Sequence, residues 1–128
     1  MSYYFNKKIM GSFDGVLGKV IASLKEEGFG ILTEIDVKET LKKKLDVDFH
    51  RYKILGACNP QFAYKALKAE DKIGTMLPCN VIVQEISEGQ TEVAAVDPVA
   101  SMRAVENPSL LEIAKQVQEK LKKVVISL

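Results

Sequence analysis

The sequence contains few of the residues from which recognisable catalytic centres are built. It has no tryptophan, one histidine and two cysteines among its 128 residues. Because His50 is the only histidine, any serine or cysteine nucleophile activated by histidine would have to use it. If residues 50–58 are extended, His50 lies ~26 Å from Cys58. The spacing therefore argues against a cysteine–histidine pair and against a metal site shared by these two side chains.

Strong charge and long apolar runs are also missing. Eighteen basic and seventeen acidic residues leave a net charge of +1, and only 7% of the residues are aromatic. This balance gives no reason to expect nucleic acid as a partner. No stretch reaches the ~18–20 apolar residues of a membrane span, and residues 1–8 do not resemble a secretory signal. We expect a cytoplasmic protein without a membrane partner, in which both cysteines are thiols.

The length and the apolar patterns predict a single α+β domain over residues 1–128. Apolar residues from Phe13 to Leu24 recur at helical spacing, whereas 30–37 alternates as a half-buried strand does. A helix is expected to begin near 107–109, with Ser109 and Glu112 as its capping box. Its long apolar stripe favours core packing, with a homodimer seam as the alternative.

A Cys-Asn dipeptide occurs twice, each time beside a proline and an apolar run. The two segments are Leu55-Gly56-Ala57-Cys58-Asn59-Pro60 and Leu77-Pro78-Cys79-Asn80-Val81. The first lies where a strand over 52–57 is expected to meet a helix, because asparagine followed by proline is a typical helix start. The second opens a strand over 79–86, which a tight turn at 88–90 joins to a strand over 91–96.

These two segments, together with Glu27-Gly28-Phe29-Gly30-Ile31-Leu32 before them and Asp97-Pro98 after them, resemble the bacterial and archaeal domain-of-unknown-function 302 family. The resemblance covers nearly the whole chain. It implies a curved, mainly antiparallel sheet backed by helices, similar to the TATA-binding-protein arrangement, and a homodimer. It implies no catalytic role, but it includes five residues in the family signature: Cys58, Asn59, Cys79, Asn80 and Asp97.

Whether the two motifs meet depends on the direction of their strands. A right-handed parallel crossover would place Cys58 and Cys79 at opposite ends of the sheet. The segment 71–77, expected to be a loop, covers up to ~23 Å when extended and permits an antiparallel return instead. The family resemblance and the hairpin that follows favour the antiparallel arrangement, so we expect the two motifs to lie at one edge of the sheet.

Three chemistries are open to such a cluster. Cys58, Cys79 and Asp97 could contribute to a zinc site, but the usual paired CxxC spacing is absent and no metal is expected. A helix that starts after Cys58 could lower the pKa of its thiol and make it reactive. Asn59 and Asn80, beside the helix start, could hold an anion. The simpler reading is that the cysteines are buried, that Asn59 caps the helix and that Asn80 bonds loop backbone.

The leading functional hypothesis is a binding module for a small molecule, with an anion as one option, at the edge formed by Cys58, Asn59, Cys79, Asn80 and Asp97. The first alternative is a thiol-dependent redox protein or enzyme that uses Cys58. The second is a structural or homodimeric interaction protein without a small-molecule site. The sequence identifies no cofactor and leaves open whether any reaction is catalysed.

Overall fold

The computed structural model describes residues 2–128 of the chain. Its strands are β1 (Tyr4–Met10), β2 (Gly30–Asp36), β3 (Tyr52–Cys58), β4 (Cys79–Ser87) and β5 (Gln90–Val96). Its helices are α1 (Phe13–Glu26), α2 (Val37–Leu45), α3 (Pro60–Ala69), the 3-10 helix η1 (Asp71–Met76), α4 (Pro98–Ser101) and α5 (Pro108–Ile126). Among these, no helix is both long enough and apolar enough to cross a bilayer.

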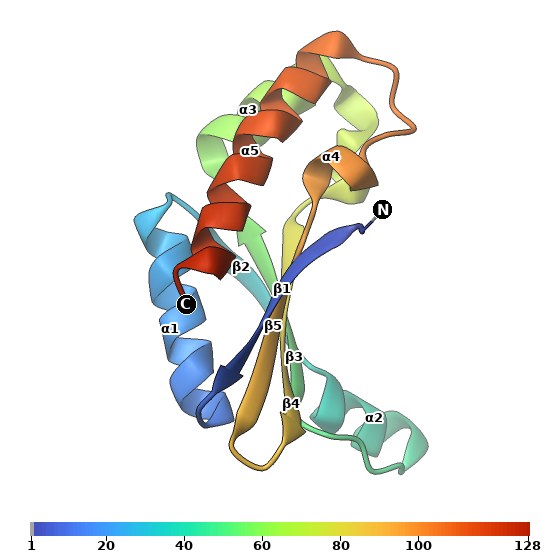
Figure 1. The fold of residues 1–128 in the computed structure, drawn as a ribbon. Coiled ribbons are helices and arrows are strands. Elements are labelled where there is room, and N and C mark those ends of the chain that lie inside the picture. Colours follow the sequence, from blue (N-terminus) through green and yellow to red (C-terminus); the bar gives the residue numbers. More distant parts are fainter. Residues whose placement is uncertain (1) are drawn as a thin grey trace.

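The five strands form one sheet in the order β1-β5-β4-β3-β2, and every neighbouring pair is antiparallel. The predicted α+β class, with an antiparallel sheet backed by helices, is therefore confirmed. Helices α1 and α5 lie on the same side of the sheet, and α2 lies at the end where β2 stops and β3 begins (Figure 1). The face that α1 and α5 leave uncovered is called the open face below.

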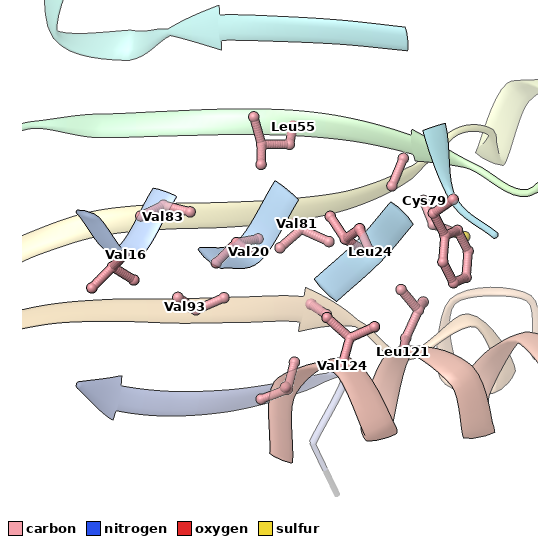
Figure 2. Close-up of a cluster of buried hydrophobic side chains, with 14 of the residues drawn as sticks. Val16, Val20, Leu24, Leu55, Cys79, Val81, Val83, Val93, Leu121 and Val124 are labelled. Atoms are coloured by element: carbon pink, nitrogen blue, oxygen red, sulfur yellow. The ribbon is translucent and has the colours of Figure 1, made fainter. Parts of the chain in front are cut away.

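The hydrophobic core lies between α1, α5 and the covered face of the sheet. Antiparallel strands direct alternate side chains to opposite faces, and Leu55, Val81 and Val93 are fully buried on the covered face. Figure 2 shows Val16, Val20 and Leu24 of α1 and Leu121 and Val124 of α5 packed around them. The apolar stripe of α5 is thus buried within the chain, which confirms core packing as its use.

The C-terminal end of α5 is held against the sheet by a charged side chain. Lys7 lies in β1, and its Nζ donates hydrogen bonds to the backbone oxygens of Ile126 and Leu128. The last carbonyl groups of a helix have no partner within the helix and carry partial negative charge. The ammonium group of Lys7 therefore supplies both hydrogen bonds and a favourable charge where α5 ends.

Two local expectations were wrong. Residues 71–76 are not an irregular loop but the 3-10 helix η1, in which Ile73 is buried. The cap of α5 is Asn107 rather than Ser109, because the Asn107 side chain accepts hydrogen bonds from the backbone amides of Ser109 and Leu110. Asparagine satisfies these amides directly, and Pro108 then occupies the first helical position, where it needs no donor.

Gly56 lies where two neighbouring segments approach β3 closely. A Cβ atom at this position would lie 2.2 Å from Thr33 Oγ1 and 2.8 Å from Pro78 Cγ. Both distances are far below van der Waals contact. Gly56 is therefore required where the bulge of β2 and the segment that leads into β4 close on β3.

We expect Gly56→Ala to lower the free energy of unfolding by about 1–3 kcal/mol, because the added methyl group overpacks this contact. Gly18→Ala is the matched control: Gly18 lies in α1, and its Cβ would meet nothing within 4 Å. The control should raise stability by about 0.5–1 kcal/mol, since alanine favours the helix. Urea unfolding of both variants measures the difference, and equal effects would contradict the close contact at Gly56.

Candidate functional site

The two Cys-Asn motifs lie on neighbouring strands at one end of the sheet. Strands β3 and β4 pair antiparallel, as predicted, with Ala57 opposite Cys79 and Gly56 opposite Asn80. Cys58 thus follows the residue that faces Cys79. The segment from Pro60 to Met76, in α3 and η1, returns the chain to the same end of the sheet.

Cys58, Asn59 and Cys79 line one small cavity of about 40 Å³. The remaining lining is apolar and comes from the residue before β2, from β3, α3 and α5, and from the segments between α3 and α5: Phe29, Ala57, Phe62, Ala63, Ala66, Leu77, Pro78, Pro98, Met102, Leu110, Ile113, Ala114 and Val117. Cavities that hold organic ligands usually measure about 300–1,000 Å³. The cavity at the shared edge is well below this range in the present structure.

The thiol of Cys79 has low reactivity in this environment. Its side chain is buried, and burial, followed by the nearby Cys58 thiol, raises the pKa of Cys79 from 9.0 to about 11. A thiol with such a pKa is protonated near neutral pH and is a poor nucleophile and metal ligand. Within residues 2–128, no group of three or more histidine, cysteine, aspartate or glutamate side chains is placed to hold a metal ion.

Asn59 does not cap α3 with its side chain, contrary to the prediction. It occupies the N-cap position, but its side chain makes no hydrogen bond to the helix, all of which is described. Its Nδ2 instead donates to the backbone oxygen of Glu27 at 3.3 Å. That carbonyl precedes Gly28, which adopts a positive φ of 86° as α1 ends. Asn59 therefore ties the end of α1 to the start of α3.

The carboxylate of Asp97 accepts hydrogen bonds from neighbouring parts of the fold. Its carboxylate caps α4, accepting from the backbone amides of Val99 at 3.0 Å and Ala100 at 3.4 Å. The same oxygen accepts a hydrogen bond from Nε2 of Gln118 in α5 at 3.0 Å. Asp97 thus joins the end of β5 to α4 and α5, and it does not line the cavity that contains the cysteines.

Asn80 points away from the cysteines. Because successive residues of a strand face opposite ways, Cys79 is buried on the covered face while Asn80 is exposed on the open face. The structure therefore brings Cys58, Asn59 and Cys79 together and separates them from Asn80 and Asp97. Asn80 instead lines a larger hollow on the open face.

This open-face groove has a volume of about 410 Å³. Its walls and floor come from the N-terminal segment, β1, β3, β4 and β5: Tyr3, Tyr4, Tyr52, Asn80, Ile82, Gln84, Glu92, Ala94, Ala95 and Val96. Three of the four tyrosines of the chain are in this set. The groove thus combines aromatic rings, an apolar floor and a few polar groups, as small-molecule sites commonly do.

A hydrogen-bonded row of polar side chains crosses this face of the sheet. Gln84 and Glu92 lie opposite each other in β4 and β5, and Gln84 Nε2 donates to Glu92 Oε1 at 2.9 Å. Asn6 Nδ2 donates to the other carboxylate oxygen, Oε2, at 2.9 Å. Because the amide nitrogen of Gln84 faces Glu92, the Oε1 atom of Gln84 is free to accept a hydrogen bond from His50 Nε2 at 2.8 Å. The row thus runs from β1 to the residue two before β3.

Tyr52 connects the polar row with the other tyrosines. It lies opposite Gln84 in the register of β3 and β4. Burial raises the pKa of its phenol, and the phenol of Tyr3 and the carboxylate of Glu92 raise it further. Tyr52, Tyr3 and Glu92 are therefore close enough to interact electrostatically across the groove.

Sequence reasoning missed this row. In the sequence, His50 is considered only as a partner of Cys58, whereas in the structure it precedes β3 and its partner is Gln84, 34 residues later in the chain. One signal was available: Asn80 and Gln84 alternate with buried valines in β4, and Glu92 follows the hairpin turn at the position that pairs with Gln84. The polar residues of this hairpin therefore share one face.

Comparisons with known proteins agree on one family. The family model described as "Domain of unknown function DUF302" matches residues 5–128. The chain is also similar to an uncharacterised conserved DUF302 protein of Bacillus stearothermophilus. The crystal structure of that protein matches with a TM-score of 0.90 and 28% sequence identity, over 98% of each chain. Among curated proteins, none matches the chain.

The two cysteines should differ sharply in alkylation. The raised pKa of Cys79 lowers its thiolate fraction near neutral pH about 100-fold relative to a pKa of 9.0, and burial blocks access as well. We expect iodoacetamide to label folded Cys79→Ala protein, which keeps the half-buried Cys58, and to leave folded Cys58→Ser protein unlabelled until it is denatured. Mass spectrometry over time measures both rates. Equal labelling of the two folded variants would contradict the buried placement of Cys79.

Asp97→Ala should lower the free energy of unfolding by about 1–2 kcal/mol, because it removes the cap of α4 and the bond to Gln118. Asp48→Ala is the control, since the Asp48 side chain is 91% exposed and lies 3.6 Å from Lys42. That change should alter stability by less than about 0.5 kcal/mol. Thermal unfolding of the two variants measures the difference. If Asp97→Ala is as mild as the control, Asp97 does not have this structural role.

Proposed function

The chain belongs to the DUF302 family, and we propose that it is a binding module for a small molecule. The observation that carries this proposal is the lining of the open-face groove of about 410 Å³, which combines three tyrosine rings, an apolar floor and a hydrogen-bonded pair of polar side chains. Hollows of similar volume lie elsewhere on the surface, so the lining and not the volume identifies this groove. The cavity at the Cys-Asn edge is about ten times smaller. We therefore place the ligand on the open face rather than at that edge.

The walls of the groove support recognition of a specific ligand. Gln84 and Glu92 are already held by hydrogen bonds to each other and to their neighbours, so little side-chain entropy is lost when a ligand binds them. Ile82, Ala94 and Val96 provide an apolar surface beside this polar row. A ligand with one polar end and an apolar body would match this arrangement.

The five signature residues take different parts in this proposal. Asn80 is the one that lines the groove, where its side-chain amide is available to a ligand. Asn59 and Asp97 lie outside the groove, where they hold the start of α3 and the connection from β5 to α5. Cys58 and Cys79 line the small cavity. A binding contribution from these four residues would then be indirect, through the position of β4.

A homodimer formed through the open face is the second candidate. It is supported by the apolar row that crosses four strands of this face, from Ala94 through Ile82 and Ile54 to Ile35. Two such rows packed against each other would exclude water. The third candidate, a redox protein that uses Cys58, is less well supported, because the neighbouring Cys79 thiol is buried and has a raised pKa.

Ala94→Trp tests the binding module, since Ala94 lies in the floor of the groove between Asn6 and Ile82 in the register. We expect the indole ring to fill the groove and to weaken binding at least tenfold. Ala104→Trp is the control, because Ala104 is exposed outside the groove. The measurement is a screen of small organic fragments of different charge, read from the amide signals of isotope-labelled protein.

The proposal expects fragments to shift the signals of β4 and β5 in the native chain and in Ala104→Trp, but not in Ala94→Trp. A screen in which no fragment shifts these signals would contradict it. Sedimentation of the same sample distinguishes the second candidate, because a dimer that buries the open face would leave the groove inaccessible to every fragment.

A further inference from the structure

We propose that the open-face groove selects ligands that carry a positively charged nitrogen next to an apolar group, with the Glu92 carboxylate as the charge partner and the tyrosine rings beside it. The chemical class is an organic ammonium or guanidinium compound. This inference rests on the proposed binding function and adds to it the charge of the ligand. It departs from the anion suggested by the Cys-Asn motifs, and the reason lies in the lining of the groove.

Glu92 is the only charged side chain among the described residues that line the groove. Its two oxygens accept hydrogen bonds from the neutral side chains of Asn6 and Gln84, which hold the carboxylate in place without cancelling its charge. Lys8 lies opposite Glu92 in the register of β1 and β5, yet it forms no ion pair with any described acidic residue. The negative charge of Glu92 thus remains available to a ligand.

The hydrogen bonds also leave room for that ligand. A carboxylate oxygen can accept more than one hydrogen bond, and each oxygen of Glu92 accepts one from the protein. An ammonium or guanidinium group can therefore add charge-assisted hydrogen bonds to a side chain that is already oriented. A ligand carboxylate or phosphate would meet only repulsion from Glu92.

The tyrosines also favour a positively charged ligand group. Tyr3 and Tyr4 stack edge to face, with ring centroids 5.0 Å apart, and Tyr52 lies opposite Gln84 in the register of β3 and β4. The faces of such rings attract cations. After burial and Tyr3, the Glu92 carboxylate also raises the pKa of the Tyr52 phenol, so the negative charge of Glu92 acts on this ring. Charge and ring placement thus favour a cation.

The floor of the groove indicates what the cation is attached to. Ile82, Ala94 and Val96 form an apolar strip beside Glu92 and Gln84. Burying alkyl or aryl groups on this strip is favourable by about 25 cal/mol for each Å² of apolar surface. A fully polar polycation would leave the strip uncovered, so the groove is better matched to a cation with an apolar substituent.

The test uses three probes with the same apolar chain and different charge: hexyltrimethylammonium, 1-hexanol and hexanoate. Their affinities are measured from the amide signals of the groove residues in the isotope-labelled full chain. We expect hexyltrimethylammonium to bind about tenfold more tightly than 1-hexanol, and hexanoate to bind most weakly. Salt should weaken binding of the cation and leave that of the alcohol unchanged.

Glu92→Gln and Glu88→Gln are the matched variants, because both remove one negative charge from the same hairpin and Glu88 is exposed at its turn. In Glu92→Gln, the cation should lose its advantage over 1-hexanol while the alcohol binds as before, which also shows that the groove is intact. In Glu88→Gln, the order of the three probes should not change.

The outcomes separate this inference from the function on which it rests. If hexanoate binds as tightly as the cation, or if Glu92→Gln leaves the preference unchanged, the charge assignment is wrong and the binding module stands. If none of the three probes shifts the groove signals while the fragment screen finds ligands there, the inference fails alone. If no fragment binds there either, the binding function fails with it.

Discussion

The fold depends on one constraint, which is that the sheet buries only one of its faces. Five antiparallel strands direct alternate residues to opposite sides, and α1 and α5 supply apolar side chains to one side only. Leu55, Val81 and Val93 are completely buried on that side. The residues between them, such as Gln84 and Glu92, are left on the open face, where they can be polar without a cost to the core. The covered face of these strands thus carries the core, while the open face keeps the polar side chains on which the proposed binding function rests.

The same alternation explains why the Cys-Asn motifs do not form one site. Cys79 and Asn80 are neighbours in the sequence but lie on opposite faces of β4. Cys58 and Asn59 lie where β3 leads into α3 and line a cavity of about 40 Å³. The Asn59 side chain donates a hydrogen bond to the backbone oxygen of Glu27. In the sequence the two motifs suggest ligand chemistry. In the structure they mark the end of the sheet where β3 ends and β4 begins. The part of these motifs that remains available to a ligand is Asn80.

Local patterns in the sequence predicted much of the fold. Helical spacing identified α1, the turn at 88–90 identified the hairpin of β4 and β5, and segment length together with the family resemblance indicated that β3 and β4 are antiparallel. The polar row was not predicted, because it depends on the register between strands. His50 and Gln84 meet only once β3 is aligned with β4. The role of Asp97 required the position of Gln118 on α5, which local sequence does not specify.

The proposed function places recognition on the open face, beside its tyrosines. Hydroxyl-radical footprinting tests it directly on protein taken from its native cell extract and on the same protein after denaturation and refolding without small molecules. If a small molecule occupies the groove, Tyr3, Tyr4 and Tyr52 are protected in the extract and become reactive after refolding. Tyr64, which lies on α3 outside the groove and is 63% exposed, should react equally in both samples. If each of the four tyrosines reacts equally in the extract and after refolding, the open face is not the recognition surface.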